Sequence, residues 1–357
     1  MNIFFNEKYQ TDLRSLLDLN FDWQKLKCSS FLITGATGLI GHSLIDFLLF
    51  LDKEFSLDIK IFGTGRNKNK FYKSFEGFCD SSKLNFIECD LSKDFDLQNV
   101  FSSINKIDYV VHLASNTHPL LYSTQPVETI TTNVFGLYNL LNLSSVLNVS
   151  RFVFASSVEV YGENRGDEKY FSENYCGYIN SNTLRAGYPE SKRLCESLCQ
   201  AFIAQKKLDV VIPRLSRVYG PTMQMDDSKA LSQFIKKALN REDIVLKSEG
   251  NQFYSYTYVL DAVSAVLCIL LNAPCGEVYN VSSPASDITL KELAELLASY
   301  SNTKVVFDLP DETERKGYST ATQAVMDNKK ILSLGWKPLF DIKNGLQNTL
   351  EILRALS

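Results

Sequence analysis

Short apolar strands alternate with helical segments across residues 29–216 of this chain. Runs of strand-forming apolar residues predict strands at 29–35, 57–65, 84–90, 107–115, 150–157 and 208–216. Apolar residues at helical spacing predict helices at 39–53, 126–148 and 188–206. Because the crossover between parallel strands is right-handed, this alternation predicts an α/β fold built on a Rossmann-type, doubly wound parallel sheet.

Glycines recur in the first turn of this pattern. The run "ITGATGLIGHS" places Gly35, Gly38 and Gly41 directly after the first strand and at the start of a helix. Glycine permits a tight turn and lets the backbone approach a pyrophosphate, while the helix N-terminus offers free N–H groups. A plain strand-to-helix turn is the alternative, but its place on the first strand of an alternating pattern favours a dinucleotide site.

The adenosine end of that site leaves the choice of dinucleotide open. A ribose-binding acid is expected near the end of the second strand, where this chain has Gly63 followed by Arg66. Arg66 either binds the 2′-phosphate of NADP or lies in solvent as a turn residue. Asp90, at the end of the third strand, either accepts from the adenine amino group or caps the strand. We expect NAD and leave NADP open.

The residues predicted to bind the cofactor follow the strands or lie on two helices. They are Gly35, Thr37, Gly38, Leu39, Ile40, Gly41, Arg66, Asp90, Leu91, Leu113, Ala114, Ser115, Asn133, Tyr188 and Lys192.

The alternation weakens after Gly220, where amphipathic helices are predicted at 227–240 and 289–300. This change indicates a smaller C-terminal lobe added to the sheet. We expect an N-terminal extension that covers the sheet edge as an amphipathic helix, a dinucleotide-binding core with a later return, and a mainly substrate-binding lobe. Their ranges are 1–26 for the extension, 27–220 with a return around 255–282 for the core, and 221–357 for the lobe.

Composition and charge limit the partners of such a chain. Its 357 residues carry a net charge of −4 with a pI near 5.6, which gives no long-range attraction for nucleic acid or an anionic membrane. No signal-peptide run opens the sequence, and the longest apolar stretches are too short to span a bilayer. Eight cysteines lack C-x-x-C spacing, so we expect reduced thiols in the cytoplasm. His42, His112 and His118 lack a metal-ligand spacing, so we expect no metal.

A tyrosine and a lysine share one face of a predicted helix. The run "YPESK" sets Tyr188 and Lys192 one helical turn apart. A nearby ammonium and the nicotinamide charge favour the phenolate and draw the tyrosine pKa down from about 10. Such a tyrosine can take a proton from a sugar hydroxyl while hydride leaves the same carbon. Y-x-x-x-K is common by chance, but the fifth strand presents Ser157 at the same sheet edge, and this combination predicts a catalytic site.

Together these motifs resemble the extended short-chain dehydrogenases/reductases of the NAD-dependent epimerase/dehydratase family. The matching segments are TGATGLIG (34–41), HLAS (112–115), NVFGLYNLL (133–141), SSVEVYG (156–162), YPESK (188–192) and RLSRVYGP (214–221). The resemblance implies a triad on Ser157, Tyr188 and Lys192, and it matches Asn133 to the asparagine that steadies the active site. It also implies a nucleotide-diphosphate sugar as substrate, oxidised transiently at C4.

Within that family, residues 183–199 and 218–239 are most similar to UDP-glucuronate decarboxylases. Glu159 belongs to the same resemblance, because it matches a glutamate that faces the substrate in decarboxylases and 4,6-dehydratases. A carboxylate out of water needs a partner or a proton. Glu159 therefore either polarises a hydroxyl or acts as an acid/base in the cleft, or it caps a backbone N–H or pairs with Arg185. Val158 replaces the aspartate of dehydratases, which argues against water elimination as the reaction.

Two departures from the family pattern fall where the substrate is expected. Arg217 replaces an asparagine, and Tyr254 replaces an arginine that contacts the nucleotide. One hypothesis is that Arg217 restores the lost positive charge and binds a phosphate or carboxylate. The alternative is a salt bridge with Asp226 or Asp227. The predicted substrate-binding residues are Arg185, Arg217 and Tyr254.

Three functions fit these motifs. The favoured one is an enzyme that recycles a tightly held nicotinamide cofactor while it epimerises a sugar at C4 or decarboxylates a C6 uronic acid. The second is a net NADPH-dependent reductase or dehydrogenase of a sugar phosphate or nucleotide-linked sugar, which Arg66 would favour. The third is a non-catalytic dinucleotide-binding protein, which the intact Ser–Tyr–Lys set argues against. The family resemblance implies surface-polysaccharide synthesis and a homodimer packed through helices 127–148 and 187–206.

Overall fold

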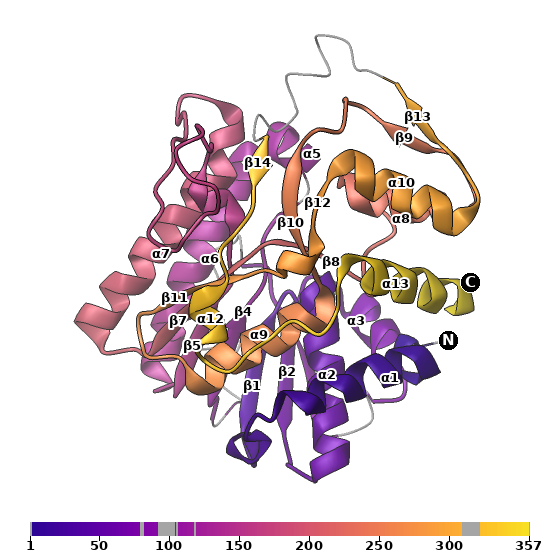
Figure 1. Cartoon of the computed structure of the whole chain (residues 1–357). Coiled ribbons are helices and arrows are strands. Elements are labelled where there is room, and N and C mark those ends of the chain that lie inside the picture. The colour runs from indigo at the N-terminus through magenta and orange to yellow at the C-terminus, as the bar shows by residue number, and fades with distance from the viewer. Residues whose placement is uncertain are drawn as a thin grey trace.

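The structure is a computed structural model that describes residues 2–78, 82–91, 104, 106–117, 119–308 and 322–356. Its helices (Figure 1) are α1 (Glu7–Ser15), α2 (Leu39–Phe55), α3 (Lys68–Ser74), α5 (Pro119–Thr124), α6 (Pro126–Val146), α7 (Gly187–Lys206), α8 (Ala230–Leu239), α9 (Val259–Asn272), α10 (Leu290–Ser301), α12 (Lys329–Leu332) and α13 (Ile342–Leu356). Its strands are β1 (Ser30–Thr34), β2 (Lys60–Gly65), β3 (Leu84–Glu88), β4 (Tyr109–His112), β5 (Arg151–Phe154), β6 (Ser156–Ser157), β7 (Val210–Leu215), β8 (Arg217–Tyr219), β9 (Ile244–Leu246), β10 (Phe253–Tyr258), β11 (Val278–Val281), β12 (Asp287–Thr289), β13 (Val305–Phe307) and β14 (Gln323–Ala324).

A parallel sheet forms the centre of the molecule (Figure 1). Its strands lie in the order β11–β7–β5–β4–β1–β2–β3, and the short β6 continues β5 beside β7. Every neighbouring pair in this order is parallel. Helices α2 and α9 pack on one face, and α6 and α7 pack on the other. The strand order and the double helical cover are those of a Rossmann fold, so the predicted fold class is confirmed.

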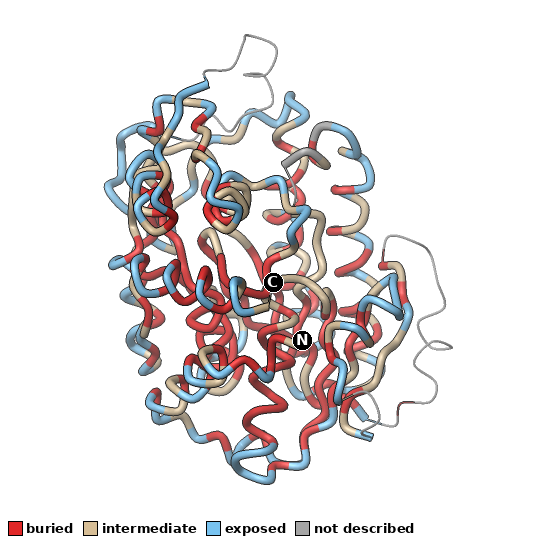
Figure 2. The backbone as a smooth tube through the Cα atoms, turned by 90° about the vertical axis from the view of Figure 1, so that its right-hand side faces the viewer, coloured by how far each residue is buried: buried red, intermediate tan, exposed pale blue. Residues whose placement is uncertain are grey.

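Side chains of the central strands alternate between two hydrophobic cores. In β1, Phe31 and Ile33 belong to the core beneath α2 and α9, whereas Leu32 belongs to the core beneath α6 and α7. In β4, Val111 and Val110 divide in the same way. Because successive strand side chains point to opposite faces and both faces are covered, these strands read as continuous apolar runs. Figure 2 shows the resulting buried interior, with exposed segments on the outer helices and loops.

A second lobe lies across the carboxyl ends of the main strands (Figure 1). In it, β12, β10 and β14 form a mixed sheet to which β8 is added through β10, and β9 pairs with β13. Helices α8 and α10 pack against each other and against β9. Between these pieces the chain returns to the main sheet, where β11 pairs with β7 after α9. Among the helices of the described ranges, none combines the length and apolar character that crossing a bilayer requires.

The N-terminal extension covers helices rather than the edge of the sheet, which corrects the expectation from the sequence. Its helix α1 is amphipathic, and its buried Tyr9 donates from its hydroxyl toward Ser43 and Asp46 of α2, at 3.1 Å to each. Arg14 forms an ion pair with Glu54, also of α2, at 3.0 Å. The polar groups of α1 find partners on a helix face, and the amphipathic pattern could not show which element would supply them.

Asp12 ties this extension to the far end of the chain. The carboxylate is buried, and it accepts hydrogen bonds from the Tyr258 hydroxyl at 2.8 Å and from the Asn348 amide at 3.0 Å. Burial is the main cause that raises the pKa of Asp12. Residues of α1, β10 and α13 therefore share one buried polar cluster.

We expect Asp12→Ala to lower the free energy of unfolding by about 1–3 kcal/mol, because it leaves a buried hydroxyl and a buried amide without their acceptor. Urea denaturation followed by circular dichroism measures the change. Asp18→Ala is the control, since Asp18 is exposed on the same extension and should shift stability by less than about 0.5 kcal/mol. Equal midpoints for the two variants would contradict a structural role for Asp12.

Candidate active site

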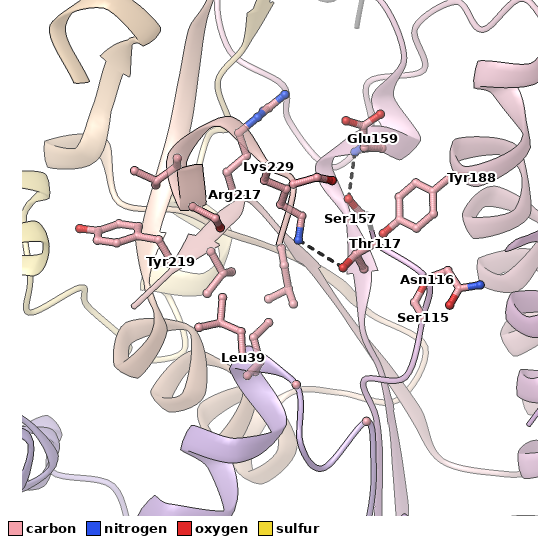
Figure 3. A pocket seen from close by; sticks show the side chains of 18 of the residues that line it. Leu39, Ser115, Asn116, Thr117, Ser157, Glu159, Tyr188, Arg217, Tyr219 and Lys229 are labelled. Carbon is pink, nitrogen blue, oxygen red and sulfur yellow. Dashed lines mark hydrogen bonds between the residues drawn. The ribbon is translucent and has the colours of Figure 1, made fainter. Parts of the chain in front are cut away.

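A cavity of about 790 Å³ lies between the carboxyl ends of the main strands and the second lobe. The core contributes the turn after β1 and residues that follow β2, β3, β4 and β5, and the lobe contributes residues of β8, α8 and β10. Of the predicted site residues, all except Asn133 line this cavity. Its volume lies within the range of small-molecule sites. Figure 3 shows Tyr188, Ser157 and Ser115 on one side, with Leu39 at the start of α2 and Lys229 reaching toward Thr117.

The glycine turn forms a cradle that side chains would fill. Gly35 has a φ of +69°, and a Cβ at this position would lie 2.9 Å from the backbone nitrogen of Ala114. A Cβ at Gly41 would lie 2.2 Å from the Gly35 carbonyl oxygen. Helix α2 begins at Leu39 with no side chain capping its N-terminal N–H groups. An open helix N-terminus beside close-packed backbone fits the pyrophosphate of NAD.

A buried threonine fixes the neighbouring backbone at the end of β4. The hydroxyl oxygen of Thr34 accepts from the N–H groups of Leu113 and Ala114 at 3.2 Å each, and it lies 2.7 Å from His112 Nδ1. Burial lowers the pKa of His112 to about 3, so this imidazole is neutral at ordinary pH. We therefore interpret His112 as a support for the cavity wall and not as a proton donor.

The second strand reaches the cavity one residue later than the sequence indicated. Gly63 is buried against the neighbouring layer, where a Cβ would lie 2.4 Å from the Phe71 ring and 3.0 Å from Ala36 Cβ. Thr64 and Gly65 at the end of β2 line the cavity, and so does Arg66 after it. Gly63 therefore does not occupy the slot expected for a ribose-binding acid, and none of the three residues that line the cavity here carries a carboxylate. Packing of a helix against the strand, which spacing does not reveal, accounts for the glycine at 63.

Tyr188 lies buried on the first turn of α7, facing the cavity beside Ser157 (Figure 3). Hydrogen bonds with the Ser157 and Ser115 hydroxyls lower its pKa, but burial outweighs them and raises the pKa to about 12. Lys192 lies on the same helix, and its ammonium donates to the Ala155 carbonyl at 2.8 Å and lies 5.9 Å from the centre of the Tyr188 ring. Burial lowers the pKa of Lys192 to about 8.

Burial thus favours the neutral forms of both groups in the protein without dinucleotide. The expected shift toward phenolate needs the nicotinamide charge as well as the ammonium, and it stays a prediction for the protein with NAD bound. Removing either charge from water favours the neutral form of each group, and at these two buried positions burial is the largest cause of each shift. Without a bound ligand, Tyr188 therefore keeps its proton at neutral pH. Tyr188 and Ser157 present two hydroxyls to whatever enters the cavity.

Asn133 lies behind the wall instead of on it. Its Oδ1 accepts from the Ser115 hydroxyl at 2.7 Å, and its Nδ2 donates to the Ser191 hydroxyl at 2.8 Å. Ser191 in turn donates to the Tyr188 carbonyl. Asn133 thus links α6 to the first turn of α7 and orients a serine that reaches the cavity.

Tyr122 is a cavity residue that the sequence analysis missed. Its ring stacks on Tyr188, with 4.8 Å between the ring centres and 20° between the ring planes. The guanidinium of Arg185 lies 5.2 Å from the centre of the Tyr122 ring. No spacing or motif distinguished this tyrosine, because the stacking joins two segments far apart in the sequence.

Glu159 and Arg185 form an ion pair at the edge of the cavity. Their Oε2 and Nη2 atoms are 2.7 Å apart, and the two side chains are 26% and 30% exposed. Both residues line the cavity. Glu159 therefore faces the cleft and also pairs with Arg185, so the two positions that the sequence offered as alternatives occur at once. The Nη1 atom of Arg185 is buried without a hydrogen-bond partner, which leaves a charged donor available to a ligand.

Arg217 and Tyr254 also lie against each other on the cavity wall. Their strands β8 and β10 are parallel neighbours, and the Arg217 guanidinium lies 3.5 Å from the centre of the Tyr254 ring. Among the described residues, Arg217 has no ion pair, and Asp227 pairs instead with Lys229. The Nη1 atom of Arg217 is buried and has no hydrogen-bond partner. The alternative of a salt bridge with Asp226 or Asp227 is therefore not observed.

Lys229 is a second cavity residue without a sequence signal. It precedes α8 in the lobe, and its ammonium donates to the Thr117 hydroxyl of the core at 3.2 Å (Figure 3). This hydrogen bond crosses from one wall of the cavity to the other. In the part of the chain that the structure describes, no three His, Cys, Asp or Glu side chains gather as metal ligands, and His118 lies outside that part.

Comparison with known proteins agrees with this architecture. The model of the NAD dependent epimerase/dehydratase family matches residues 31–282. UDP-glucuronic acid decarboxylase 1 of Danio rerio is 29% identical over 324 residues, which cover 90% of this chain and 71% of that protein. UDP-glucuronic acid decarboxylase 5 of Arabidopsis thaliana is 29% identical over 320 residues, which cover 88% of this chain and 86% of that protein.

Solved structures share the fold at lower identity. The UDP-glucose 4-epimerase of Thermotoga maritima, solved with UDP-glucose, superposes with a TM-score of 0.78 at 22% identity and covers 92% of this chain and 99% of its own. The UDP-glucuronic acid 4-epimerase of Bacillus cereus, solved with UDP-glucuronic acid and NAD, superposes with a TM-score of 0.77 at 22% identity. It covers 92% of this chain and 100% of its own.

Proposed function

We propose that this chain, which belongs to the NAD-dependent epimerase/dehydratase family, is an enzyme that modifies a nucleoside-diphosphate sugar through transient oxidation at C4. The observation that carries the proposal is the position of the Tyr188 and Ser157 hydroxyls in the same cavity as the glycine turn. The UDP-sugars named for the related decarboxylases and for the epimerase structures support this substrate class.

NAD bound at the turn would supply a reversible acceptor for hydride. The chain's own residues would do the rest. Ser157 and Tyr188 would hold the C4 hydroxyl by hydrogen bonds, and Tyr188 would take its proton and later return it. Lys192, held by the Ala155 carbonyl, would place positive charge near the phenol as the phenol loses its proton. The burial of Tyr188 and the ring of Tyr122 stacked on it would keep water from the reactive carbon.

Decarboxylation is the reaction that we favour for the oxidised sugar. A C4 ketone makes a C6 carboxylate a β-keto acid, so the C5–C6 bond can break with its electron pair moving toward the ketone oxygen. Carbon dioxide then leaves, C5 takes a proton, and hydride returns to C4. Arg185, with its unpartnered buried Nη1, suits a substrate carboxylate, and Glu159 beside it suits proton transfer or polarisation of a hydroxyl. The decarboxylase names of the curated relatives support this choice.

Incubation with a panel of UDP-, dTDP-, GDP- and CDP-sugars that includes uronic acids, followed by NMR, tests the reaction. We expect loss of carbon dioxide from a nucleotide-linked uronic acid, with a pentose product and no net consumption of cofactor. Inversion at C4 without loss of carbon would replace decarboxylation by epimerisation. Steady consumption of NADPH would favour the reductase instead, and the absence of any turnover would contradict the enzymatic proposal.

Glu159→Gln keeps the size of the side chain and removes its charge, so we expect turnover to fall by about 10²–10⁴-fold with cofactor affinity unchanged. Steady-state kinetics and titration with NAD measure the two effects. Glu190→Gln is the control. Glu190 also lies near Tyr188 in sequence, but it does not line the cavity, and its carboxylate accepts a hydrogen bond from the Ser181 hydroxyl. Unchanged turnover in Glu159→Gln would leave Glu159 a structural role only.

We also propose that Arg217 binds a phosphate of the nucleoside diphosphate in place of the arginine that Tyr254 replaces. Its guanidinium lies over the Tyr254 ring, 3.5 Å from the ring centre, and its buried Nη1 has no partner. A guanidinium offers a rigid pair of donors that matches a phosphate. The neighbouring strands β8 and β10 would thus supply the same charge from a different position.

We expect Arg217→Ala to weaken substrate binding by about tenfold or more, because it removes a charged hydrogen bond worth about 1.5–3 kcal/mol. Isothermal titration with the substrate identified by NMR measures the change. Arg165→Ala is a matched control, since the Arg165 guanidinium also lies over a tyrosine, Tyr178, at 3.9 Å but outside the cavity. Equal affinity in Arg217→Ala and the natural protein would rule out the phosphate contact.

A homodimer packed through α6 and α7 completes the proposal. Along one side of α6, Val127, Phe135, Tyr138 and Val146 are exposed and fall within one stripe of the helix, and Leu194 is exposed on the adjacent α7. A two-fold axis would place this stripe against its own copy, which buries apolar surface on both subunits. The family resemblance implies the same pair of helices.

We expect Phe135→Glu combined with Tyr138→Glu to convert a dimer into a monomer, because charges would be forced into the apolar contact. Sedimentation velocity measures the mass. Phe307→Glu is the control, since Phe307 is a similarly exposed aromatic on β13, in the other lobe. A monomeric natural protein, or a double variant that remains dimeric, would contradict this interface.

A further inference from the structure

A cation, Arg66, lines the cavity where the adenosine of a dinucleotide is expected. Strand β2 brings Gly65 and the following Arg66 to the cavity wall. The surrounding segment, residues 59–75, contains four lysines and this arginine but no aspartate or glutamate. Dinucleotide sites that select NAD place a carboxylate on the ribose 2′-hydroxyl at the end of this strand, and that charge also repels a 2′-phosphate. This chain has the strand end without the carboxylate.

Among the residues that the structure describes, no other carboxylate takes its place. Of the described residues that line the cavity, Asp90 and Glu159 carry carboxylates. Asp90 follows the next strand, β3, and Glu159 is paired with Arg185 beside Tyr188. Glu88 is the strand neighbour of Gly65 by register, but it is exposed and does not line the cavity.

Arg66 is exposed and available, and the backbone just before it is fixed. In the described residues its guanidinium forms no hydrogen bond or ion pair, so a ligand would not have to displace a partner. The strand end just before it is fastened on two sides, because the Thr64 carbonyl accepts from Ala36 of the glycine turn and the Gly65 carbonyl accepts from Cys89 after β3. Lys70, by contrast, is already bonded to Gln224 of the lobe. Arg66 is thus a cation that a ligand at this end can bind without displacing a partner.

We propose that this site binds NADP(H) at least as tightly as NAD(H), with Arg66 contacting the 2′-phosphate. An arginine near the end of the second strand accommodates this phosphate in Rossmann folds, and its planar fork matches phosphate oxygens. The proposal deepens the proposed function, because it rests on the same dinucleotide site and names the form of the cofactor that the site accepts. Arg66 acts here as a specificity-determining residue and has no part in the chemical step.

Direct binding tests the proposal without any turnover. The full chain, freed of retained nucleotide, is titrated with NAD and NADP by calorimetry and with their reduced forms by fluorescence. We expect a Kd for NADP equal to or below that for NAD. Arg66→Ala should raise the Kd for NADP by about tenfold and change the Kd for NAD by less than about twofold, since only the phosphate loses a charged contact.

Two further variants sharpen the test. Gly65→Asp supplies the missing carboxylate, and a Cβ there would lie 3.5 Å from the Phe86 ring, an ordinary contact, so we expect it to fold and to shift preference to NAD. Lys73→Ala removes an exposed cation of α3 outside the cavity and should change neither Kd. Tighter binding of NAD than of NADP by the natural protein, with no effect of Arg66→Ala, would overturn this proposal and leave the proposed function standing. Failure to bind either dinucleotide would overturn both.

Discussion

The close packing of the glycine turn against the end of β4 is the constraint on which the rest of this structure depends. Gly35 turns the chain with a left-handed backbone, and no side chain fits between it and Ala114. Gly41 lets α2 pass over the Gly35 carbonyl, where a Cβ would lie at 2.2 Å. Thr34 holds the adjoining backbone of β4 by its hydroxyl. These few contacts decide where α2 starts and where its free N–H groups point, and they set one wall of the cavity.

The second lobe is fastened to the same turn, so the two walls of the cavity are joined at their base. The Thr222 hydroxyl donates to the Leu39 carbonyl at 2.8 Å, and the Gln224 amide donates to the Thr37 carbonyl. Thr222 also lies 2.9 Å from the Ser43 hydroxyl, which the buried Tyr9 of the N-terminal extension contacts in turn. A chain of hydrogen bonds thus runs from the extension through α2 to the lobe.

Burial shifts the pKa values of the polar groups in the cavity and leaves some of their donors without partners. It raises the pKa of Tyr188 and lowers that of Lys192, since each charged form loses its hydration. Two guanidinium groups, on Arg185 and Arg217, each keep a buried donor without a partner. A buried, unpaired charged donor is unfavourable for folding, and an anionic ligand relieves that cost. The same two arginines that cost stability in the absence of a ligand therefore favour an acidic substrate.

Alternating strands and helices, the glycine spacing and the Tyr–Lys pair are local patterns, and the sequence by itself determined from them the Rossmann sheet, the dinucleotide turn and the shared face of Tyr188 and Lys192. Only the tertiary structure decided that Tyr122 stacks on Tyr188, that Arg217 lies on Tyr254, and that the strand end facing the cavity begins at 64. These facts depend on contacts between segments far apart in the chain. Periodicity along a sequence records which face of an element is apolar, but it carries no information on which distant side chain comes to lie against it.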